Sequence, residues 1–220
     1  MLKFFEKLLK AKIESSRKPY DHSFPAFSDA FCQEILEIKK EWGDFVRASE
    51  SKGLPIDDLS DAQKSLNEDK KWKSLFLFGY SYYNTALTPH FPVTMTLIRK
   101  YESQITLAMF STTEPGKHIP AHKGNNHGVL RLQIGIDIKE SDQCFLRVED
   151  KILYLKEGER FVFDDTFEHE LGNQSNADRT VLIIDFYKPL PVIYDRLNRK
   201  KMDELKKSNY IQSVIKKLTN

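Results

Sequence analysis

The sequence predicts a mainly β fold with flanking helices, in which a jelly-roll or barrel core carries helices on its outside. Between residues 104 and 189, short apolar segments recur roughly every 8–12 residues, separated by turn residues and without a helical pattern between them. Both ends of the chain instead have lysine-rich sequences of helical period. The chain has 220 residues, 40% of them hydrophobic and 12% aromatic, which suffices for a core, and we expect one domain over residues 1–220.

Residues 1–71 are expected to form a mostly helical N-terminal part. Apolar residues at close to helical spacing occur among its first lysines: Leu2, Phe5, Leu9 and Ile13. This pattern is typical of an amphipathic helix, which either docks on the rest of the protein or touches a membrane surface. A second helix is expected from Ser28 to Ala48, with five candidates for burial: Phe31, Ile35, Leu36, Ile38 and Phe45. The charged segment from Ser51 to Lys71 is expected to be a solvated loop with one helical turn.

Residues 72–191 contain the expected strands. A strand with aromatic residues begins at Trp72, and a short helix is expected over Val93–Lys100 after a proline-containing turn. The β core follows at about residues 104–189. Its strands are expected at 105–111, 129–138, 145–148, 152–155, 161–163 and 180–187, with the third and fourth forming a hairpin. The tail, residues 192–220, returns to a helical pattern from Ile193 to Lys217.

Charge and cysteine content exclude several classes of protein. Lysine and arginine total 34 against 32 aspartate and glutamate, a net charge of +2, which gives no general electrostatic case for nucleic acid as a partner. Two cysteines, Cys32 and Cys144, are too few for a disulfide-stapled secreted scaffold. The longest apolar runs, such as Val181–Asp185, are far shorter than the roughly 18 residues of a membrane-spanning helix. Charges interrupt the first residues, unlike in a signal peptide. We expect a cytoplasmic protein, free or in peripheral contact with the inner face of a membrane.

Two histidine-containing segments are candidates for metal binding. The segment Pro115–His127 holds three of the six histidines, and a fourth, His169, lies in Phe163–Glu170. Neutral imidazole is the commonest transition-metal ligand in proteins, and histidines from different strands of a barrel can meet inside it. His122 precedes one expected strand and His169 follows another, so these two are the candidate ligands. The other histidines are interpreted as rim or structural residues.

A cation follows the second histidine in sequence. Arg179 comes ten residues after His169 and leads into the apolar strand Thr180–Phe186. Iron oxygenases that use 2-oxoglutarate need histidine ligands together with a basic group that holds the distal carboxylate of this cosubstrate. Arginine suits the second task because its planar fork binds a carboxylate through two hydrogen bonds and stays charged.

The expected strand 129–138 has two different faces. Since side chains alternate along a strand, one face holds only aliphatic residues: Leu130, Leu132, Ile134, Ile136 and Ile138. Arg131 and Gln133 lie on the other face. Either the aliphatic face packs on another layer while Arg131 and Gln133 line a polar cavity, or these two residues face solvent.

One position departs from the usual iron site of two histidines and one carboxylate. The carboxylate normally stands two residues after the first histidine, and here that residue is Gly124. Either the carboxylate comes from elsewhere, or the metal has two protein ligands and an additional open position. Water or chloride could occupy such a position, so a halogenase stays among the alternatives.

Four segments carry a family resemblance: Glu114–Gly124 (EPGKHIPAHKG), Leu130–Ile136 (LRLQIGI), Phe163–Glu170 (FDDTFEHE) and Arg179–Pro189. In order and spacing they resemble the aspartyl/asparaginyl β-hydroxylase family of Fe(II)- and 2-oxoglutarate-dependent dioxygenases, which includes bacterial lipid A hydroxylases. The string FDDTFEHE is far more specific than a two-residue motif. The resemblance covers about residues 72–191, and residues 1–71 and the C-terminal tail add nothing to it.

The resemblance implies a double-stranded β-helix, a cupin-like jelly-roll, and iron held by two histidines without a carboxylate. By position, His122 and His169 would be the metal ligands, which resolves the question at Gly124 in favour of hydroxylation. Arg179, with Ser111 nearby, would bind the distal carboxylate of 2-oxoglutarate.

Three further positions have implied roles in cosubstrate binding, catalysis or substrate recognition. Arg131 would help to hold the other carboxylate of 2-oxoglutarate, and Asp165 would orient a metal-bound water or a ligand imidazole. Gln133 stands where animal members have a histidine on the cosubstrate strand; it can still donate a hydrogen bond but carries no charge. Val129 stands where animal members have an arginine that engages the substrate. The resemblance therefore supports the family's reaction for this chain more strongly than it supports the family's substrate.

The expected function is an Fe(II)- and 2-oxoglutarate-dependent dioxygenase that uses O₂ to hydroxylate an unactivated C–H bond. Its substrate would be a peptide or amino acid, a lipid acyl chain or another small molecule. The alternative is a non-catalytic cupin-like module that binds a metal or a small acid. The sequence sets neither the substrate nor the oligomeric state.

Overall fold

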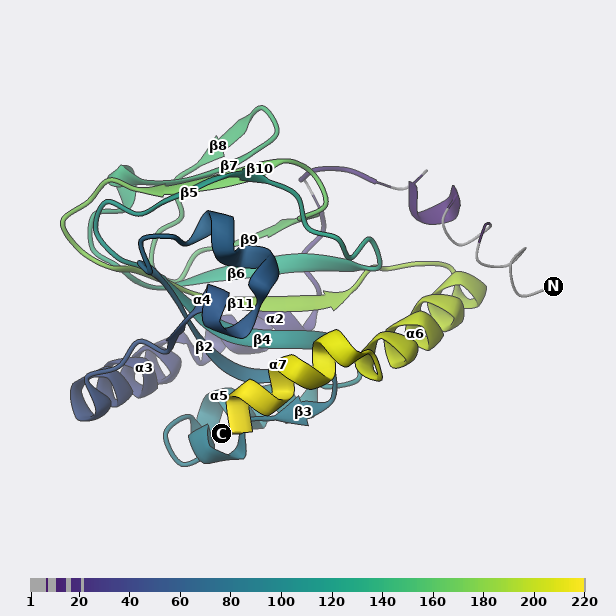
Figure 1. Cartoon of the computed structure of the whole chain (residues 1–220), viewed down its shortest axis with the longest axis horizontal. Coiled ribbons are helices and arrows are strands. Elements are labelled where there is room, and N and C mark those ends of the chain that lie inside the picture. The colour runs from purple at the N-terminus through teal and green to yellow at the C-terminus, as the bar shows by residue number, and fades with distance from the viewer. Residues whose placement is uncertain (1–6, 8–10, 15–16, 21, 220) are drawn as a thin grey trace.

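In the part of the chain that the structure describes, two antiparallel β-sheets face each other (Figure 1). The structure is a computed structural model, and it describes every residue except 1–6, 8–10, 15–16, 21 and 220. The larger sheet has the strand order β1-β2-β4-β11-β6-β9, with β3 paired to β2, and the smaller has the order β5-β10-β7-β8. The strands of the larger sheet are β1 (Leu54–Pro55), β2 (Trp72–Gly79), β3 (Tyr82–Tyr83), β4 (Ile105–Thr113), β6 (Val129–Ile138), β9 (Arg160–Phe163) and β11 (Arg179–Tyr187). Those of the smaller sheet are β5 (His118–His122), β7 (Cys144–Val148), β8 (Lys151–Leu153) and β10 (His169–Asn173).

From β4 onward, the chain alternates between the two sheets. Strands β4, β6, β9 and β11 lie in the larger sheet, whereas β5, the hairpin β7–β8 and β10, which come between them in sequence, lie in the smaller sheet. This alternation defines a double-stranded β-helix, or jelly-roll. The predicted mainly β, cupin-like fold with flanking helices is therefore confirmed. The predicted hairpin is also present, with Leu146 opposite Leu153.

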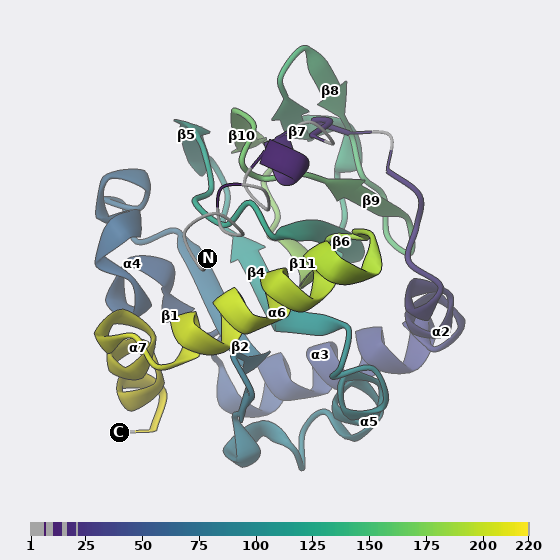
Figure 2. The same ribbon diagram turned by 90° about the vertical axis from the view of Figure 1, so that its right-hand side faces the viewer.

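Three helices cover the outer face of the larger sheet: α2 (Phe27–Gln33), α3 (Ile35–Ser49) and α5 (Pro92–Lys100) (Figure 2). Four of the five aliphatic residues predicted on one face of β6, from Leu130 to Ile136, pack in the same apolar cluster as these helices, and Ile134 and Ile136 are fully buried. Burial of each such side chain away from water contributes roughly 1.5–3 kcal/mol to the free energy of folding.

The predicted place of Ile138 on this face of β6 is wrong: the pairing of β6 with β11 shifts register between Thr180 and Val181, and Ile138 packs in a separate cluster with Val181. Because side chains alternate along β6, Arg131 and Gln133 face the space between the sheets. These two residues are thus turned inward rather than towards solvent, and Gln133 is buried.

The helix expected over residues 28–48 is two helices, because Glu34 leaves the helical conformation (φ −95°, ψ 15°). After this break, Ile38 and Phe45 point to the sheet and are buried. Leu36 lies on the opposite side of α3 and is 75% exposed, so its predicted burial is wrong. Helix α5 starts at Pro92, close to the predicted position.

Residues 51–71 are more ordered than the predicted solvated loop. They contain β1, the single helical turn α4 (Ile56–Leu59) and the 3₁₀ helix η1 (Asp61–Leu66); two other 3₁₀ turns are η2 (Thr85–Leu87) and η3 (Ser141–Gln143). Ile56 packs with Trp72 and with Ile119 of β5 in a small apolar cluster. The Asp57 carboxylate accepts hydrogen bonds from Lys70 and from Asn67, the latter at 2.6 Å. These contacts attach the segment to the edge of both sheets.

The predicted C-terminal helical pattern forms two helices, α6 (Val192–Lys206) and α7 (Asn209–Thr219). Asn198 of α6 donates from Nδ2 to the carbonyl oxygen of Gly128 over 2.7 Å, and Asn126 donates to the Met202 sulfur over 3.3 Å. A Cβ on Gly128 would lie 2.1 Å from Oδ1 of Asn198, so glycine is needed for this close approach. Helix α6 is thereby attached to the segment that connects β5 to β6.

The predicted N-terminal amphipathic helix falls largely outside the described residues. Of its four apolar positions, Leu2, Phe5 and Leu9 lie outside, and Ile13 lies in a described helical stretch, where it is buried. No helix in the described part of the chain is long and apolar enough to cross a membrane.

A candidate metal centre between the sheets

The two candidate metal ligands lie side by side at the edge of the smaller sheet. His122 is the last residue of β5, His169 is the first residue of β10, and the two residues are paired in register. Their ring centroids are 4.2 Å apart. The structure therefore brings together the two histidines that the sequence analysis selected, although both lie within strands rather than beside them. Sequence periodicity missed these strands because β5 is a polar edge strand that contains Pro120.

Both imidazole rings are oriented by the backbone in the same way. Nδ1 of His122 lies 2.8 Å from the carbonyl oxygen of Pro120, and Nδ1 of His169 lies 3.0 Å from that of Phe167. A carbonyl oxygen only accepts, so each Nδ1 carries the hydrogen and each Nε2 keeps a lone pair. Such anchoring of the second ring nitrogen is usual for histidines that bind metals.

Burial keeps both histidines neutral. It lowers the pKa of His169 to about 3, with a further contribution from His122, and it also lowers the pKa of His122. Neutral imidazole is the form that binds a metal ion. The donor set consequently fits a divalent transition metal such as Fe(II), with Nε2 of each ring as the ligand atom.

A third protein ligand is absent from the described residues, because no group of three or more His, Cys, Asp or Glu residues there could hold a metal. The space beside Gly124 is instead occupied by Asp165. The N–H of Gly124 donates to the Asp165 carbonyl oxygen over 2.7 Å, and a Cβ on Gly124 would lie 2.6 Å from the Asp165 carboxylate. Where the usual iron site has a ligand carboxylate, this chain has a glycine that makes room for another acidic side chain.

Arg131 is held between two carboxylates. Its Nε and Nη2 each donate to Asp185 over 2.8 Å, and its Nη1 lies 3.2 Å from Oδ2 of Asp165. Burial raises the pKa of Asp165 to about 6, although Arg131 opposes this shift. The role of Asp185 was not predicted from the sequence. This residue interrupts an apolar strand, but its role depends on the pairing of β11 with β6, which places it opposite Arg131.

Arg179 is a buried cation without an acidic partner among the described residues. It is 1% exposed; its Nη2 donates to Oε1 of Gln133 over 3.1 Å, and its Nε has no hydrogen-bond partner. Burial lowers the pKa of Arg179 to about 10, which leaves it charged at neutral pH. An unneutralised buried charge is costly, so this guanidinium is well suited to an anionic ligand such as a carboxylate.

Hydroxyl groups lie next to Arg179 on the inner face of the larger sheet. Ser111 of β4 is paired with Val181, two residues along β11 from Arg179, and its Oγ accepts a hydrogen bond from Nε1 of Trp72 over 2.9 Å. Ser74 is opposite Ser111 on β2, and its buried Oγ has no hydrogen-bond partner among the described residues. The predicted neighbours of the cosubstrate carboxylate are thus near each other.

The turn that carries Asp165 is braced by a buried ion pair. The carboxylate of Asp164 accepts hydrogen bonds from the Thr166 N–H at 3.2 Å, the Thr166 hydroxyl at 2.6 Å and the Lys188 ammonium at 2.7 Å. Asp164 and Lys188 are both buried. Asp164 therefore braces this turn, and Lys188, directly after β11, provides its charge partner.

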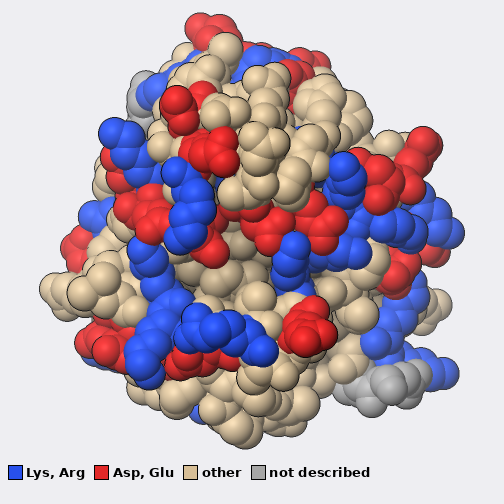
Figure 3. All heavy atoms as spheres, turned by 90° about the vertical axis from the view of Figure 1, so that its left-hand side faces the viewer, with Lys and Arg blue, Asp and Glu red and all other residues tan. Residues whose placement is uncertain are grey.

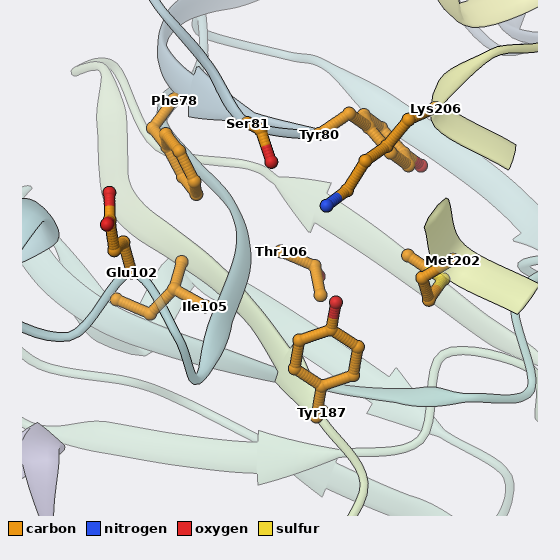
Figure 4. A pocket seen from close by; sticks show the side chains of 9 residues that line it. All are labelled: Phe78, Tyr80, Ser81, Glu102, Ile105, Thr106, Tyr187, Met202 and Lys206. Atoms are coloured by element: carbon orange, nitrogen blue, oxygen red, sulfur yellow. The ribbon is translucent and has the colours of Figure 1, made fainter. Parts of the chain in front are cut away.

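A separate hollow lies where α6 meets the larger sheet (Figure 4). Tyr80, Thr106 and Tyr187 of the sheet region line it together with Met202 and Lys206 of α6. Its lining includes neither of the two candidate ligands nor an arginine of the centre. We therefore treat it as part of the packing of α6 and not of the metal centre.

Residues 33–189 match the family model described as aspartyl/asparaginyl β-hydroxylase. The match begins well before residue 72, so the expectation that residues 1–71 carry no resemblance is wrong; α3 is included.

Two curated relatives cover most of this chain. The ornithine lipid ester-linked acyl 2-hydroxylase of Rhizobium tropici is 36% identical over 174 residues, which is 76% of this chain and 61% of that protein. The human aspartyl/asparaginyl β-hydroxylase is 26% identical over 168 residues, 72% of this chain and 22% of that protein. The chain therefore spans less than two thirds of the length of these relatives.

Among solved structures, cupin domains are similar to this chain. The cupin domain of an XRE-family transcriptional regulator from Enterobacter cloacae is 13% identical, with a TM-score of 0.38, and covers 54% of this chain and 99% of its own. The cupin domain of Schizosaccharomyces pombe Cnp3 is 11% identical, with a TM-score of 0.38, and covers 60% of this chain and 70% of its own.

Proposed function

Because the chain belongs to the aspartyl/asparaginyl β-hydroxylase family, we propose that it is an Fe(II)- and 2-oxoglutarate-dependent dioxygenase that hydroxylates an unactivated C–H bond. One observation carries the proposal. Two adjacent, neutral histidines with free Nε2 atoms share the space between the sheets with Arg179, a buried arginine that has no acidic partner in the described structure. Together they provide a metal site and a carboxylate site.

Each residue of the centre has a definite task in this proposal. When bound, iron with 2-oxoglutarate and O₂ supplies the oxidation, in which 2-oxoglutarate becomes succinate and CO₂ and one oxygen atom enters the substrate. His122 and His169 hold the metal through Nε2. Arg179 binds the distal carboxylate of 2-oxoglutarate through its planar fork, with the Ser111 hydroxyl beside it. Gln133 keeps that fork oriented through the hydrogen bond from Nη2.

Arg131 and the two carboxylates around it serve a different purpose. Each nitrogen of Arg131 already contacts Asp185 or Asp165, which fixes its position, and its charge and the second N–H groups of Nη1 and Nη2 act on the other carboxylate of 2-oxoglutarate. Asp165 lies four residues before His169 in the sequence. Its backbone carbonyl is hydrogen-bonded to the segment that follows His122. With a pKa of about 6, its carboxyl group can keep or release a proton close to neutral pH.

We propose that the substrate is an ester-linked acyl chain of a membrane lipid. The support comes from the relative of Rhizobium tropici, which is 36% identical to this chain. That protein is named as an ornithine lipid ester-linked acyl 2-hydroxylase. A peptide aspartate or asparagine is the second candidate, because the human relative is named for that reaction and is 26% identical. Val129 is apolar and buried, so it offers no charge for an acidic side chain.

The test is turnover by the purified chain with Fe(II), 2-oxoglutarate and ascorbate, in the presence of a bacterial lipid extract or of peptides containing aspartate and asparagine. We expect succinate formation and a mass gain of one oxygen in a lipid acyl chain. His122→Ala and His169→Ala should abolish both. His118→Ala, on the same strand as His122 but 59% exposed, is the matched control and should retain activity.

Other outcomes separate the alternatives. Oxygen insertion into a peptide instead of a lipid would replace the proposed substrate but keep the reaction. Binding of 2-oxoglutarate without succinate formation on any substrate would favour the non-catalytic module. Chloride-dependent turnover with chlorinated product would identify a halogenase. If neither metal nor 2-oxoglutarate binds, the whole proposal is wrong.

A further inference from the structure

We propose that the solvent-facing side of α6 is a docking surface for an anionic membrane. The inference rests on the proposed lipid substrate, because an enzyme that acts on a lipid acyl chain must reach the membrane. It adds to that proposal by assigning the membrane contact to residues of α6.

The exposed side of α6 combines an apolar end with a row of basic side chains. At 3.6 residues per turn, the residues directly opposite the buried Asn198 and Met202 form one stripe. Its members are Ile193, Arg196, Lys200, Asp203, Glu204 and Lys207, with Val192 at its margin, and all are exposed. Val192 is 70% exposed and Ile193 is 57% exposed, although both are large apolar residues.

The charge of the C-terminal helices is strongly positive. Residues 192–219 contain eight lysine and arginine residues and three aspartate and glutamate residues, a net charge of +5 in a chain of net charge +2. Asp195 and Asp203 are each paired within α6, with Arg199 and Lys206 at 2.8 Å. Arg196 and Lys200 have no ion pair within the described part of the chain, so their charges are available to a partner.

The opposite side of the molecule has no such asymmetry. Figure 2 shows α6 crossing the face of the molecule that lies on the right in Figure 1. Figure 3 shows the opposite face, where acidic and basic side chains are interspersed. On α3, for example, Lys40 is paired with Asp44 at 3.5 Å. The excess of basic residues on the C-terminal helices is therefore not repeated on this opposite face.

The docking surface is also linked to the metal centre. The segment between His122 and β6 is attached to α6 through Asn126 and Gly128. An amphipathic surface with apolar residues at one end and a basic row beside them is suited to anionic headgroups and the acyl boundary beneath them. Neither a second copy of this chain, whose net charge is near neutral, nor an acidic protein accounts equally well for both the apolar and the basic residues.

The experiment measures vesicle binding by the metal-free full chain, without cosubstrate, in a co-sedimentation assay. One set of vesicles contains phosphatidylcholine alone, and in the other roughly one third of the lipid is phosphatidylglycerol. We expect binding to the second set only. The double variant R196Q/K200Q should bind about 30-fold more weakly, since each basic residue near an anionic surface contributes roughly a factor of five. The control K40Q, on α3, should bind like the wild type.

A second variant tests the apolar end. V192S/I193S should weaken binding even in high salt, where the contribution of Arg196 and Lys200 is screened. Both double variants should retain turnover of detergent-dispersed lipid, which separates a failure of docking from a failure of the proposed reaction. Equal binding to both vesicle types, or wild-type binding by R196Q/K200Q, would overturn the docking surface. So would a wild-type dimer that V192S/I193S dissociates, because a second copy would then cover this side of α6.

Discussion

The N–H of Gly124 donates to the backbone carbonyl of Asp165 over 2.7 Å, and the missing side chain of Gly124 leaves the space in which the Asp165 carboxylate lies. This relationship explains why a carboxylate two residues after His122 is not possible in this chain. A side chain at that position and the carboxylate that contacts Arg131 would need the same volume. Packing around Asp165 thus excludes a carboxylate ligand at position 124 of the candidate metal centre.

Adding one methyl group at Gly124 should impair metal binding without unfolding the protein. In Gly124→Ala the new Cβ would lie 2.6 Å from the Asp165 carboxylate, which must move away from its contact with Arg131. Loss of interactions around the metal ligands, such as this contact of Asp165, typically lowers metal affinity 10- to 100-fold. We expect a decrease of about that size. Calorimetric titration with Mn(II) or anaerobic Fe(II) measures it.

The matched control is Gly43→Ala in α3, where the new Cβ would meet only the flexible end of Arg47, at 3.2 Å. It should bind metal with unchanged affinity. If Gly124→Ala also binds metal like the wild type, Asp165 does not support the centre.

Replacing Arg179 by lysine should weaken cosubstrate binding specifically. Lysine keeps the positive charge but cannot form two parallel hydrogen bonds with a carboxylate. We expect the KM for 2-oxoglutarate in Arg179→Lys to rise at least tenfold, with a small change in kcat at saturation. Arg160→Lys, which alters an arginine paired with Asp29 at 2.7 Å, is the control. Equal KM values for both variants would argue against a carboxylate site at Arg179.

The buried His169 should make the metal-free protein less stable in acid. Burial lowers its pKa to about 3, whereas an unfolded histidine has a pKa of about 6.5. Between these values the unfolded chain binds the additional proton, so stability decreases as the pH falls from 6.5 towards 3. Asp165 has the opposite effect on stability. Because its pKa is raised in the folded protein, the folded chain takes up this proton at a higher pH than the unfolded chain does, which favours folding as the pH falls.

Comparison with His169→Asn isolates the histidine contribution. Between pH 7 and pH 5 the wild type should lose about 2 kcal/mol of unfolding free energy relative to this variant, at roughly 1.4 kcal/mol per pH unit below the unfolded pKa. Urea denaturation at both pH values gives the difference. A wild type and variant with parallel pH dependence would show that His169 is not buried in its neutral form.

The buried pair of Lys188 and Asp164 should show strong coupling. Lys188→Met leaves the Asp164 carboxylate buried without its cation, and we expect a loss of about 3–5 kcal/mol of unfolding free energy. The double variant with Asp164→Asn should recover part of this loss. Lys206→Met, which removes the surface partner of Asp203, should cost about 1 kcal/mol or less. Additive effects of the two core substitutions in urea denaturation would contradict the coupling.

Side-chain alternation was sufficient to predict β6 and to separate its aliphatic residues from Arg131 and Gln133, whereas it left open whether these two face the interior or solvent. The aliphatic residues of this strand can be stabilised only against another apolar layer, so Arg131 had to turn inward once helices covered the sheet. The histidine pair was also predictable, because imidazole chemistry restricts the ligand candidates to a few residues. The four-residue interval from Asp165 to His169 and the FDDTFEHE string carried the family resemblance.

Contacts between strands distant in sequence were not predictable in the same way. Asp185 meets Arg131, 54 residues earlier, only because β11 lies between β4 and β6. Strands β5 and β10 are short and polar, so periodicity did not reveal them. Leu36 is exposed because, two residues before the buried Ile38, it lies on the opposite side of α3.

The unmatched charge of Arg179 has a consequence for the lifetime of the protein. A folded chain that keeps a cation in its interior without an anion is less stable than one in which a dicarboxylate has neutralised it. Ligand at a hundred times its Kd would add about 2.7 kcal/mol to the unfolding free energy. With 2-oxoglutarate as the proposed cosubstrate, the abundance of this protein should therefore follow the supply of 2-oxoglutarate, because its depletion would leave more of the chain open to proteolysis.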